Sequence, residues 1–396
     1  MNEKKVAVLL HGPVHHDGRV IKMIRTMSRW ASVDLFYLNG KQEDRTLFNS
    51  KVRLFSLKQP SSTIAKWVRH SFFYKEFDFM AAEVLQQGIA YDWIYCNDLP
   101  TLHPGIRIKR KLGSRLLYDS HEIYIETINQ FFPRNRGGIK GSIFDFLIGF
   151  MRTTGGKFEA KAIRLADAVL TVNESLAVYF AEKYQLRTRP TVVYNCPDKQ
   201  FLYSSPRNLR EEWMLPNDAI LLLYQGVLNE GRGLRLMIEA LQELDKKFHL
   251  LIVGDGPLKG ELQKLSHKLE LQSRVHFIGR VAYEDLSSYT RSADIGINLL
   301  ENTNLSKSMA LANKLFEYIH SGIPVLSSNT PEHRKIYDKY RIGELTLNGT
   351  NEISQGIEKI WQSKKEYSIA LMAAKEAYNW ECQEISLLEA LNLVPD

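Results

Sequence analysis

The stretch ALANKLFEYIHSGIPVLSSN, residues 310–329, joins a helical pattern directly to a short apolar run. Its apolar residues repeat at helical spacing, at Leu311, Leu315, Phe316 and Ile319. The polar side of the same helix would hold Asn313, Lys314, Glu317 and Ser321. Gly322 suits the end of a helix, and Pro324 opens the run that follows. The stretch therefore predicts a helix leading into a buried strand, which is the repeating unit of a parallel α/β sheet.

The same alternation extends in both directions along the chain. The apolar runs are VAVLL, VDLFYL, WIYCND, RLLYDS and AVLTV in the first half, then AILLLYQG, HLLIVGDG, VHFIG, DIGINLL and IPVLSS in the second. Continuous apolar strands separated by helices are typical of parallel sheets covered on both faces. A polar segment with two prolines, residues 194–213, separates the two sets. We therefore predict two α/β domains, each built on a doubly wound parallel sheet.

Length and composition agree with two domains. A chain of 396 residues with 44% hydrophobic content can bury two sizeable cores. The cysteines, Cys96, Cys196 and Cys382, show neither disulfide nor zinc spacing, which favours a reducing, cytoplasmic setting. We expect no signal peptide, because the first apolar run is short. We also expect no spanning helix, because no window approaches the roughly 18 apolar residues required.

The formal net charge of +7 is unevenly distributed. Residues 1–200 carry 30 Lys and Arg against 19 Asp and Glu, whereas residues 201–396 carry 22 against 26. A basic half of this kind can face phosphates, nucleic acid or an anionic membrane surface. Solvated helix faces on a basic protein are the alternative explanation.

Polar residues follow three of the first-half runs. Residues 11–19 follow the first run, Asn97 and Asp98 follow WIYC, and residues 119–122 follow RLLY. Because the carboxyl ends of parallel strands meet at one sheet edge, we expect these residues to form one wall of a ligand cleft. The histidines at positions 11, 15 and 16 could instead bind a metal, but three ligands from one short loop converge poorly, so we expect no metal site.

The second half offers groups suited to a diphosphate and a ribose. Lys314 and Glu317 lie three residues apart near a helix start, where an ammonium can meet a diphosphate and a carboxylate a ribose diol. A surface ion pair between them is the alternative. Gly226 ends a predicted strand, and Arg232 follows in a glycine-rich turn where a guanidinium can grip a phosphate. The glycines of LIVGDGPLKG imitate a dinucleotide fingerprint, but they follow the second strand of their domain, which disfavours NAD(P).

Several segments resemble, in order, the motifs of glycosyltransferase family 4. They are DGRVIK, NDLPTL and YDSHE in the first half, then YQGVLNEGRGL, IVGDGP, VHFIGRV, NKLFEYIHSGIPVL and YNWECQE. The resemblance spans nearly the whole chain and implies the GT-B fold, two Rossmann-like domains facing each other across a cleft. The implied boundaries are 1–200 for the acceptor-side domain, 201–371 for the nucleotide-sugar domain, and 372–396 for a C-terminal helix crossing back to the first domain.

The resemblance also implies roles for individual residues. Glu317 matches the glutamate that holds the ribose, Arg232 the basic residue that holds the diphosphate, and His121 the histidine that faces the transferred sugar. The implied catalytic residues are His121, Arg232 and Lys314. The implied donor-binding residues are Gly226, Arg232, Gly279, Arg280, Val281, Asn313, Lys314 and Glu317, of which Gly279 to Val281 frame the base. The implied loop facing the sugar and the acceptor comprises Gly12, His16, Asp17, Gly18 and Asp98.

Two positions depart from the family pattern. The family's paired glutamates stand eight residues apart, but Met309 stands eight residues before Glu317. Arginine often follows the glycine of YQG, where this chain has Val227. We infer a variant branch in which Lys314 supplies the charge that Val227 lacks. A non-catalytic GT-B partner subunit and a non-hydrolysing sugar-nucleotide epimerase stay open as alternatives.

The implied activity is metal-independent, retaining transfer of a hexosyl group from a UDP- or GDP-linked sugar, with no cofactor. Basic residues 65–77 and 107–115 and the apolar residues 143–151 suggest a glycan or lipid-linked acceptor at an anionic membrane surface. Packed amphipathic helices are the alternative. We expect a cytoplasmic enzyme of polysaccharide biosynthesis, peripheral at the inner face of the plasma membrane. Nucleic acid is not expected as a partner, because it would leave the polar strand ends unexplained.

Overall fold

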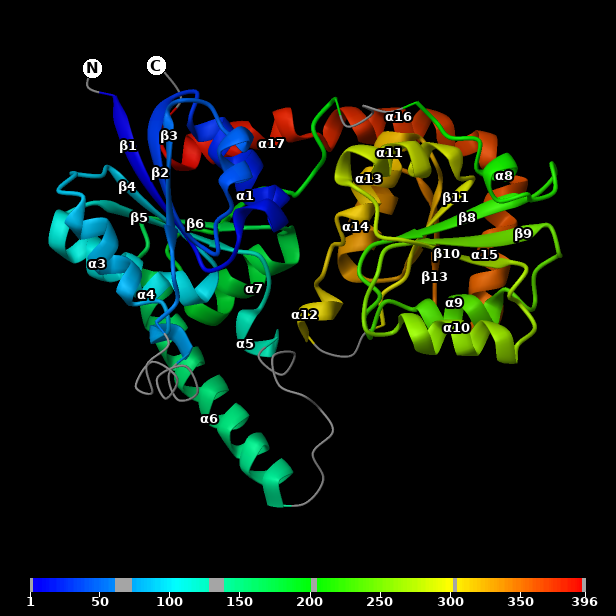
Figure 1. The fold of residues 1–396 in the computed structure, drawn as a ribbon, viewed down its shortest axis with the longest axis horizontal. Helices are drawn as coiled ribbons and strands as arrows, with labels where there is room; N and C mark the ends of the chain where they lie inside the picture. Colours follow the sequence, from blue (N-terminus) through cyan, green and yellow to red (C-terminus); the bar gives the residue numbers. More distant parts are fainter. Residues whose placement is uncertain (1–2, 61–72, 128–138, 201–204, 302–304, 394–396) are drawn as a thin grey trace. The chain divides into compact units, whose positions relative to one another are not determined.

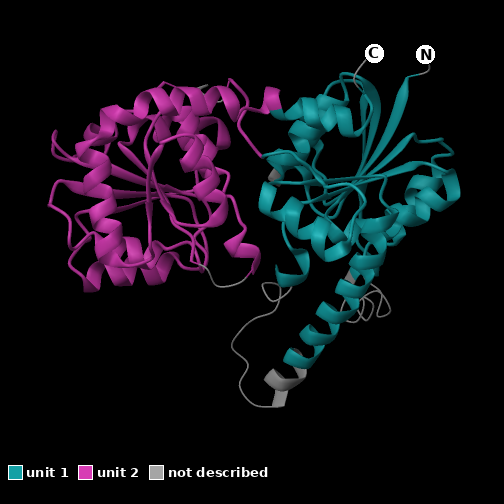
Figure 2. Cartoon of the chain, turned by 180° about the vertical axis from the view of Figure 1, so that it is seen from behind, with its two compact units in different colours: residues 1–194, 383–396 teal, residues 195–382 magenta. Residues whose placement is uncertain are grey.

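The computed structural model describes residues 3–60, 73–127, 139–200, 205–301 and 305–393. The chain forms two compact units (Figure 2). Unit 1 comprises residues 1–194 and 383–396, and unit 2 comprises residues 195–382. The chain therefore passes from unit 1 to unit 2 once and returns near its C-terminus.

Unit 1 is built on a seven-stranded sheet in the order β3-β2-β1-β4-β5-β6-β7. All of its strand pairs are parallel. The strands are β1 Lys4–Leu10, β2 Ala31–Leu38, β3 Val52–Leu57, β4 Trp93–Asn97, β5 Arg115–Ser120, β6 Ala168–Thr171 and β7 Thr191–Val192. Because the strand order reverses direction between β1 and β4, the residues after these two strands lie at the switch point where open α/β sheets bind ligands.

The helices of unit 1 cover both faces of this sheet. They are α1 Gly18–Met27, α3 Phe79–Gln86, α4 Asp98–Leu112, α5 Tyr124–Thr127, α6 Ile139–Ala162 and α7 Glu174–Tyr184. Right-handed crossovers on either side of the switch point place α1 and α4 on opposite faces, as Figure 1 shows. The first half of α6 extends away from the sheet (Figures 1 and 2). Helix α17, Trp380–Ala390, begins in unit 2 and ends in unit 1.

Unit 2 is built on a six-stranded parallel sheet in the order β10-β9-β8-β11-β12-β13. The strands are β8 Ile220–Gln225, β9 Phe248–Val253, β10 Val275–Gly279, β11 Ile295–Asn298, β12 Val325–Ser328 and β13 Gly343–Thr346. Its switch point lies between β8 and β11. Strands β8, β9, β11 and β12 are buried throughout their lengths, as their continuous apolar runs predict.

The helices of unit 2 connect these strands. They are α8 Leu209–Glu212, α9 Leu234–Ala240, α10 Lys259–Lys268, α11 Tyr283–Ser292, α12 Leu305–Ser308, α13 Lys314–Ser321, α14 Pro331–Lys339, α15 Thr350–Gln362 and α16 Ser368–Ala377. Local chemistry fixes several ends: Thr330 accepts a hydrogen bond from the His333 amide with Pro331 in the first turn, and Gly322 closes α13 in the left-handed conformation.

The predicted fold class is confirmed: the chain contains two Rossmann-like parallel-sheet units. One boundary differs from the pattern, because α13 begins at Lys314 and leaves Leu311 before the helix. Among the described helices, none combines the length and apolar character needed to cross a membrane. The basic segment predicted at 65–77 lies outside the described residues from 65 to 72.

Candidate functional site

In unit 1, the polar residues after β1, β4 and β5 lie at one sheet edge. Asp98 follows β4 directly and has a positive φ of 59°, an uncommon conformation for a residue with a side chain. Its carboxylate accepts a hydrogen bond from the His121 backbone amide at 3.1 Å and lies 3.3 Å from His121 Nδ1. The structure therefore brings together the residues after β4 and β5.

The other side of the His121 ring meets a second carboxylate. His121 Nε2 lies 3.3 Å from Asp119 Oδ2, so both ring nitrogens face aspartates. Burial lowers the pKa of His121, but the charges of Asp98 and Asp119 raise it well above its ordinary value of 6.5. An imidazolium held in this way has both N–H groups engaged and is unsuited to act as a base or a nucleophile.

Asp119 is itself fixed by a buried arginine. Arg19, from α1, donates from Nε and Nη2 to the two Asp119 oxygens at 3.1 and 2.9 Å and from Nη1 to the Val193 carbonyl at 2.6 Å. The Tyr95 hydroxyl donates to Asp119 at 2.6 Å. Burial opposes ionisation of Asp119, but the Arg19 and His121 charges hold its pKa below the usual carboxyl range. The result is a fixed chain of alternating charges, Arg19, Asp119, His121 and Asp98.

His11 lies beside these four charged residues and differs from His121 in its protonation state. Its ring contacts Phe77 and Tyr124, with centroid separations of 5.7 and 6.2 Å. Burial lowers the pKa of His11, and the His121 charge lowers it further against the opposing effect of Asp98. We infer a neutral His11 next to a charged His121.

The loop after β1 is partly structural. Asp17 caps α1 by accepting from the Val20 amide at 3.0 Å, and His15 Nδ1 lies 3.1 Å from Asp44. The space at Gly12 and Gly18 is open, because a Cβ at either position would meet nothing within 4 Å. His16 ends the short helix Val14–His16, and its side chain lies outside the described structure.

In unit 2, the central observation is the burial of Lys314. Its side chain is only 7% exposed, and Nζ makes no hydrogen bond within the described part of the chain. Nζ lies 3.6 Å from the centroid of the Tyr224 ring on β8. Burial lowers the pKa of Lys314 well below its ordinary value, and the nearby Arg232 charge lowers it further while Glu317 opposes. Helical spacing groups Lys314 with the polar residues Glu317 and Ser321, but the structure buries its side chain.

The loop after β8 brings Arg232 close enough to Lys314 and Tyr224 for its charge to act on both. Burial raises the pKa of Tyr224 to about 12, and the Arg232 charge opposes this shift. The Tyr224 hydroxyl donates to the Val227 carbonyl at 2.9 Å, which ties the loop to the strand. Glu301 accepts from the Gly233 amide at 3.1 Å, and Lys307 donates to the Glu230 carbonyl at 3.1 Å. The loop is thus held from both sides by residues that follow β11.

The glycines of IVGDGP have a packing explanation. Gly254 has a φ of 142°, and a Cβ there would lie 1.9 Å from the Gly226 carbonyl oxygen. A Cβ at Gly256 would lie 2.6 Å from the Leu228 carbonyl oxygen. These glycines allow the loop after β9 to pack against the loop after β8, and they do not open a helix, because α10 begins at Lys259.

Glu317 lies one turn into α13 and accepts a hydrogen bond from the Gln225 side-chain amide. The first-turn amides of this helix are less available than expected. The amides of Leu315 and Phe316 donate to the carbonyls of Ala312 and Asn313 at 3.1 and 3.0 Å. An anion at this helix start would therefore depend chiefly on side-chain cations.

The remaining predicted donor residues lie at the same carboxyl-terminal edge of the unit 2 sheet. Gly226 directly follows β8 with a φ of 128°, and Gly279 ends β10 with a φ of 88°. Arg280 is exposed after β10, and Val281 is half-buried. Asn313 precedes α13 and is exposed, and Met309 follows α12.

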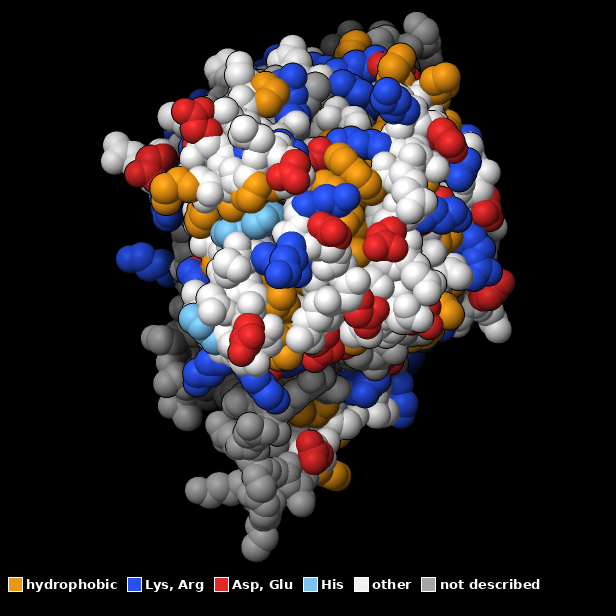
Figure 3. All heavy atoms as spheres, turned by 90° about the vertical axis from the view of Figure 1, so that its right-hand side faces the viewer, with side chains coloured by type: hydrophobic (Ala, Val, Ile, Leu, Met, Phe, Trp, Pro, Cys, Tyr) orange, Lys and Arg blue, Asp and Glu red, His pale blue; other side chains and the backbone are white. Residues whose placement is uncertain are grey.

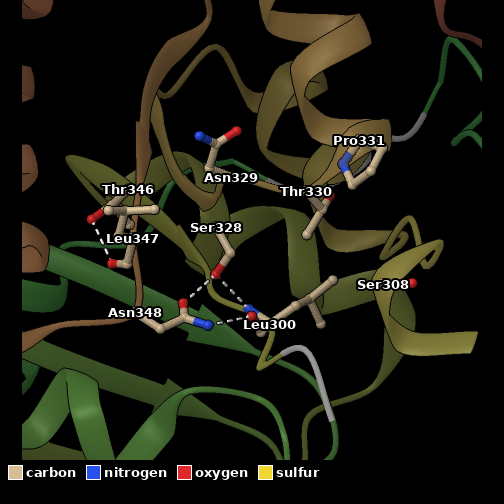
Figure 4. Close-up of a pocket in the computed structure, with 9 residues that line it drawn as sticks. All are labelled: Leu300, Ser308, Ser328, Asn329, Thr330, Pro331, Thr346, Leu347 and Asn348. Carbon is tan, nitrogen blue, oxygen red and sulfur yellow. Dashed lines mark hydrogen bonds between the residues drawn. The ribbon is translucent and has the colours of Figure 1, made fainter. Parts of the chain in front are cut away.

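A hollow of about 210 Å³ opens at the far side of this edge, beyond β11 (Figure 4). Polar groups that line this hollow form hydrogen bonds with one another. Ser328 accepts from the Leu300 amide at 2.9 Å and donates to Asn348 at 2.8 Å, and Asn348 donates to the Leu300 carbonyl at 2.9 Å. We interpret these contacts as a structural hydrogen-bond network that joins the ends of β11, β12 and β13.

The electrostatic character of unit 2 is mixed. On the face drawn in Figure 3, Lys and Arg side chains are interspersed with Asp and Glu, in keeping with the near balance of charges in residues 201–396. Within the described ranges, no group of three or more His, Cys, Asp and Glu side chains could hold a metal ion.

The sequence patterns missed several residues of this site. Tyr95, Gln225, Thr290 and Lys307 contribute contacts that spacing alone does not reveal. A signal existed for Gln225, which is a polar residue at the end of an otherwise apolar strand. Arg19 lies within the predicted residues 11–19, but its pairing with Asp119, 100 residues away, is not apparent from the sequence.

Comparison with known proteins agrees with these observations. Residues 206–378 match the family described as Glycosyl transferases group 1. D-rhamnosyltransferase WbpZ of Pseudomonas aeruginosa is 34% identical over 138 residues, which cover 32% of this chain and 35% of that protein. The O-antigen biosynthesis glycosyltransferase WclY of Escherichia coli is 27% identical over 162 residues, covering 38% of this chain and 40% of that protein. The matches thus span well under half of these relatives' lengths.

Solved structures match nearly the whole chain. Anabaena Alr3699/HepE, in complex with UDP, superposes with a TM-score of 0.74 at 16% identity, covering 98% of this chain and 100% of that one. WaaG, a glycosyltransferase involved in lipopolysaccharide biosynthesis, gives a TM-score of 0.67 at 16% identity, covering 99% and 100%. These likenesses show the fold, which is that of GT-B glycosyltransferases.

Proposed function

We propose that the protein is a retaining, metal-independent glycosyltransferase of family 4 that uses a UDP- or GDP-linked sugar. The buried Lys314 ammonium carries the proposal, because a cation without a hydrogen-bond partner among the described residues has a strong requirement for an anionic ligand. The diphosphate of a sugar nucleotide meets that requirement, and Arg232 adds a second cation at the same edge. The UDP complex of HepE supports a nucleotide ligand for this fold.

The proposed mechanism uses these fixed charges on the leaving group. As the glycosidic bond breaks, negative charge grows on the departing diphosphate, and Arg232 and Lys314 stabilise it. Glu317 accepts hydrogen bonds from the ribose. The departing phosphate takes the proton of the acceptor hydroxyl on the same face, so no enzymatic base is needed, and the anomeric configuration is retained.

His121 has an electrostatic role in this proposal. Both of its ring nitrogens are engaged by aspartates, so it fixes charge and geometry at the unit 1 edge. The loop with Gly12, Asp17 and Gly18 is the proposed wall for the transferred sugar and the acceptor. Retention is tested by NMR assignment of the anomeric configuration in the purified product, and an inverted product would contradict it.

Two rival functions stay open for this fold. A non-catalytic partner subunit would bind the nucleotide without releasing sugar, and an epimerase would change the sugar without needing an acceptor. Incubation with UDP- and GDP-sugars, with and without a glycan acceptor, separates the three functions. Acceptor-dependent release of nucleoside diphosphate is the result that transfer predicts.

We further propose a lipid-linked acceptor of surface-polysaccharide assembly, reached by peripheral docking at the inner face of the plasma membrane. The support is helix α6, whose extended half exposes Phe146 by 73% and Phe150 by 39%, one helical turn apart. Exposed aromatic residues on a basic domain suit insertion at an anionic lipid surface.

Vesicle sedimentation tests this docking. Binding to anionic vesicles should weaken steeply between low and physiological salt and should fall in the variant Phe146→Ser/Phe150→Ser. The matched control is Ile369→Ser in unit 2, where the side chain is 81% exposed. Equal binding to neutral and anionic vesicles, or none, would remove the membrane proposal and leave the enzyme assignment standing.

A further inference from the structure

We propose that Gln225 is a positioning residue that orients the Glu317 carboxylate toward the ribose, and that this contact sets a preference for ribonucleotides over 2′-deoxyribonucleotides. The proposal rests on the proposed nucleotide-sugar function. It adds to that function a residue that makes no direct contact with the reacting atoms.

Gln225 is rigidly held at the end of β8. Its side chain is 2% exposed, and its backbone amide donates to the Tyr318 hydroxyl at 3.3 Å. The side-chain nitrogen Nε2 donates to Glu317 Oε2. The side-chain oxygen Oε1 accepts from the Thr290 hydroxyl of α11 at 2.8 Å. Strand β8 thus connects α11 to α13 through one buried amide.

The direction of these hydrogen bonds follows from the chemistry of the carboxylate. An ionised Glu317 only accepts, so the amide must turn its N–H groups toward it and its oxygen toward Thr290. The Thr290 hydroxyl also lies 2.8 Å from the Leu286 carbonyl oxygen, so its single hydrogen has two acceptors. The hydrogen bond from the Gln225 N–H group is therefore the contact that orients Glu317, and the Thr290 contact helps to hold the Gln225 amide in place.

This arrangement suits diol binding. A carboxylate offers about four lone-pair sites, so a hydrogen bond from Gln225 leaves capacity for ribose hydroxyls. A glutamate side chain has several rotatable bonds, and a fixed N–H donor reduces the conformational entropy that ribose binding must remove. Loss of the donor should weaken contacts to the ribose hydroxyls and leave contacts to the diphosphate in place.

The test compares calorimetric affinities of UDP and 2′-deoxy-UDP for the full chain and its variants. The wild-type chain should prefer UDP by about tenfold or more, since a hydrogen bond to a charged group is lost. Gln225→Met keeps the length of the side chain without its amide, and the preference should fall to about threefold or less. Thr290→Val should lower it by a smaller factor. The matched control is Thr346→Val on β13, which should retain the wild-type preference.

The outcomes separate this inference from the function on which it rests. A merely structural role for Gln225 would weaken both nucleotides equally and leave their ratio unchanged, which would overturn the inference. Glu317→Ala should abolish the preference, and adding Gln225→Met to it should change the ratio no further. Failure of the wild-type chain to bind UDP, GDP or their 2′-deoxy forms would instead overturn the proposed function.

Discussion

The Lys314 ammonium nitrogen lies 3.6 Å from the centre of the Tyr224 ring, so an aromatic face takes the place of a hydrogen-bond acceptor. A cation–π contact contributes about 0.5–2 kcal/mol, whereas burying an ammonium costs several kcal/mol. The ring therefore offsets only part of the desolvation. Because part of the desolvation cost is not offset, an anion that binds beside Lys314 would gain from pairing with the ammonium.

Replacement of Lys314 by methionine should stabilise the ligand-free protein while damaging the site. Lys314→Met keeps the side-chain length and removes the buried charge, so the free energy of unfolding should rise by about 1–3 kcal/mol. Affinity for a nucleoside diphosphate should fall by about 2 kcal/mol, the value of one charge-assisted hydrogen bond. Urea unfolding and calorimetry measure the two effects, and Lys259→Met on α10 is the surface control. A destabilised Lys314→Met would show that the ammonium is already well paired.

Nucleotide binding should take up protons. Burial and Arg232 lower the pKa of Lys314 in the free protein, whereas an adjacent diphosphate favours its charged form and raises the pKa. Affinity should therefore fall as pH rises through the free-state pKa. Calorimetry in buffers of different ionisation enthalpy detects the uptake above about pH 7.5, where the nucleotide phosphate no longer titrates. Uptake that persists unchanged in Lys314→Met would assign it to another group.

The buried charge chain of unit 1 should be costly to interrupt. Asp119→Asn leaves Arg19 and His121 without their common carboxylate, so the free energy of unfolding should fall by about 3–5 kcal/mol. Glu174→Gln, which breaks the exposed pair with Arg189, should cost less than about 1 kcal/mol. Urea denaturation at neutral pH compares the two variants, and equal losses would contradict the account.

The same row of buried charges predicts that the protein loses stability in acid. Burial opposes ionisation of Asp119 and Asp98, but the neighbouring cations hold both pKa values below the ordinary 3.8. Their contribution is complete above that value and is lost as pH falls through the folded pKa values. The raised pKa of His121 acts oppositely: its contribution is present below 6.5 and is lost as pH rises through the folded pKa. Asp119→Asn should flatten the acid limb of the stability curve.

Substitutions in the two units should have different effects. Glu317→Ala should weaken diphosphate binding by about 1.5–3 kcal/mol, and Arg232→Ala should also slow transfer by about 10²–10³. His121→Ala should leave affinity for the free diphosphate nearly intact while lowering turnover, because its contacts lie within unit 1. Calorimetry alongside product assays checks this division. Loss of diphosphate affinity in His121→Ala, with none in Glu317→Ala, would reverse the assignment.

The sequence predicted the interior of both sheets better than their edges. Ten continuous apolar runs correspond to observed strands, whereas β3, β7 and β13 had no predicted run. These three are edge strands. In β3, exposed and half-buried residues follow a single buried one, so one-sided packing removes the continuous apolar signal.

The site was predictable only in part. The residues after the strands were identifiable, because parallel topology places them at one edge. The burial of Lys314 was not, because helical spacing assigns it to a polar face and the covering ring comes from Tyr224, 90 residues earlier. Gln225 and Arg19 likewise act through partners that are distant in sequence.

The most direct test of the central claim is a thermal-shift measurement on the full chain in EDTA with UDP, GDP, ADP and CMP. The account predicts that UDP or GDP raises the melting temperature by several degrees at about 100 times the dissociation constant. The same nucleotide should give a much smaller shift in Lys314→Met/Arg232→Ala. Stabilisation by none of the four nucleotides, or only after addition of manganese or magnesium, would contradict the proposed donor site.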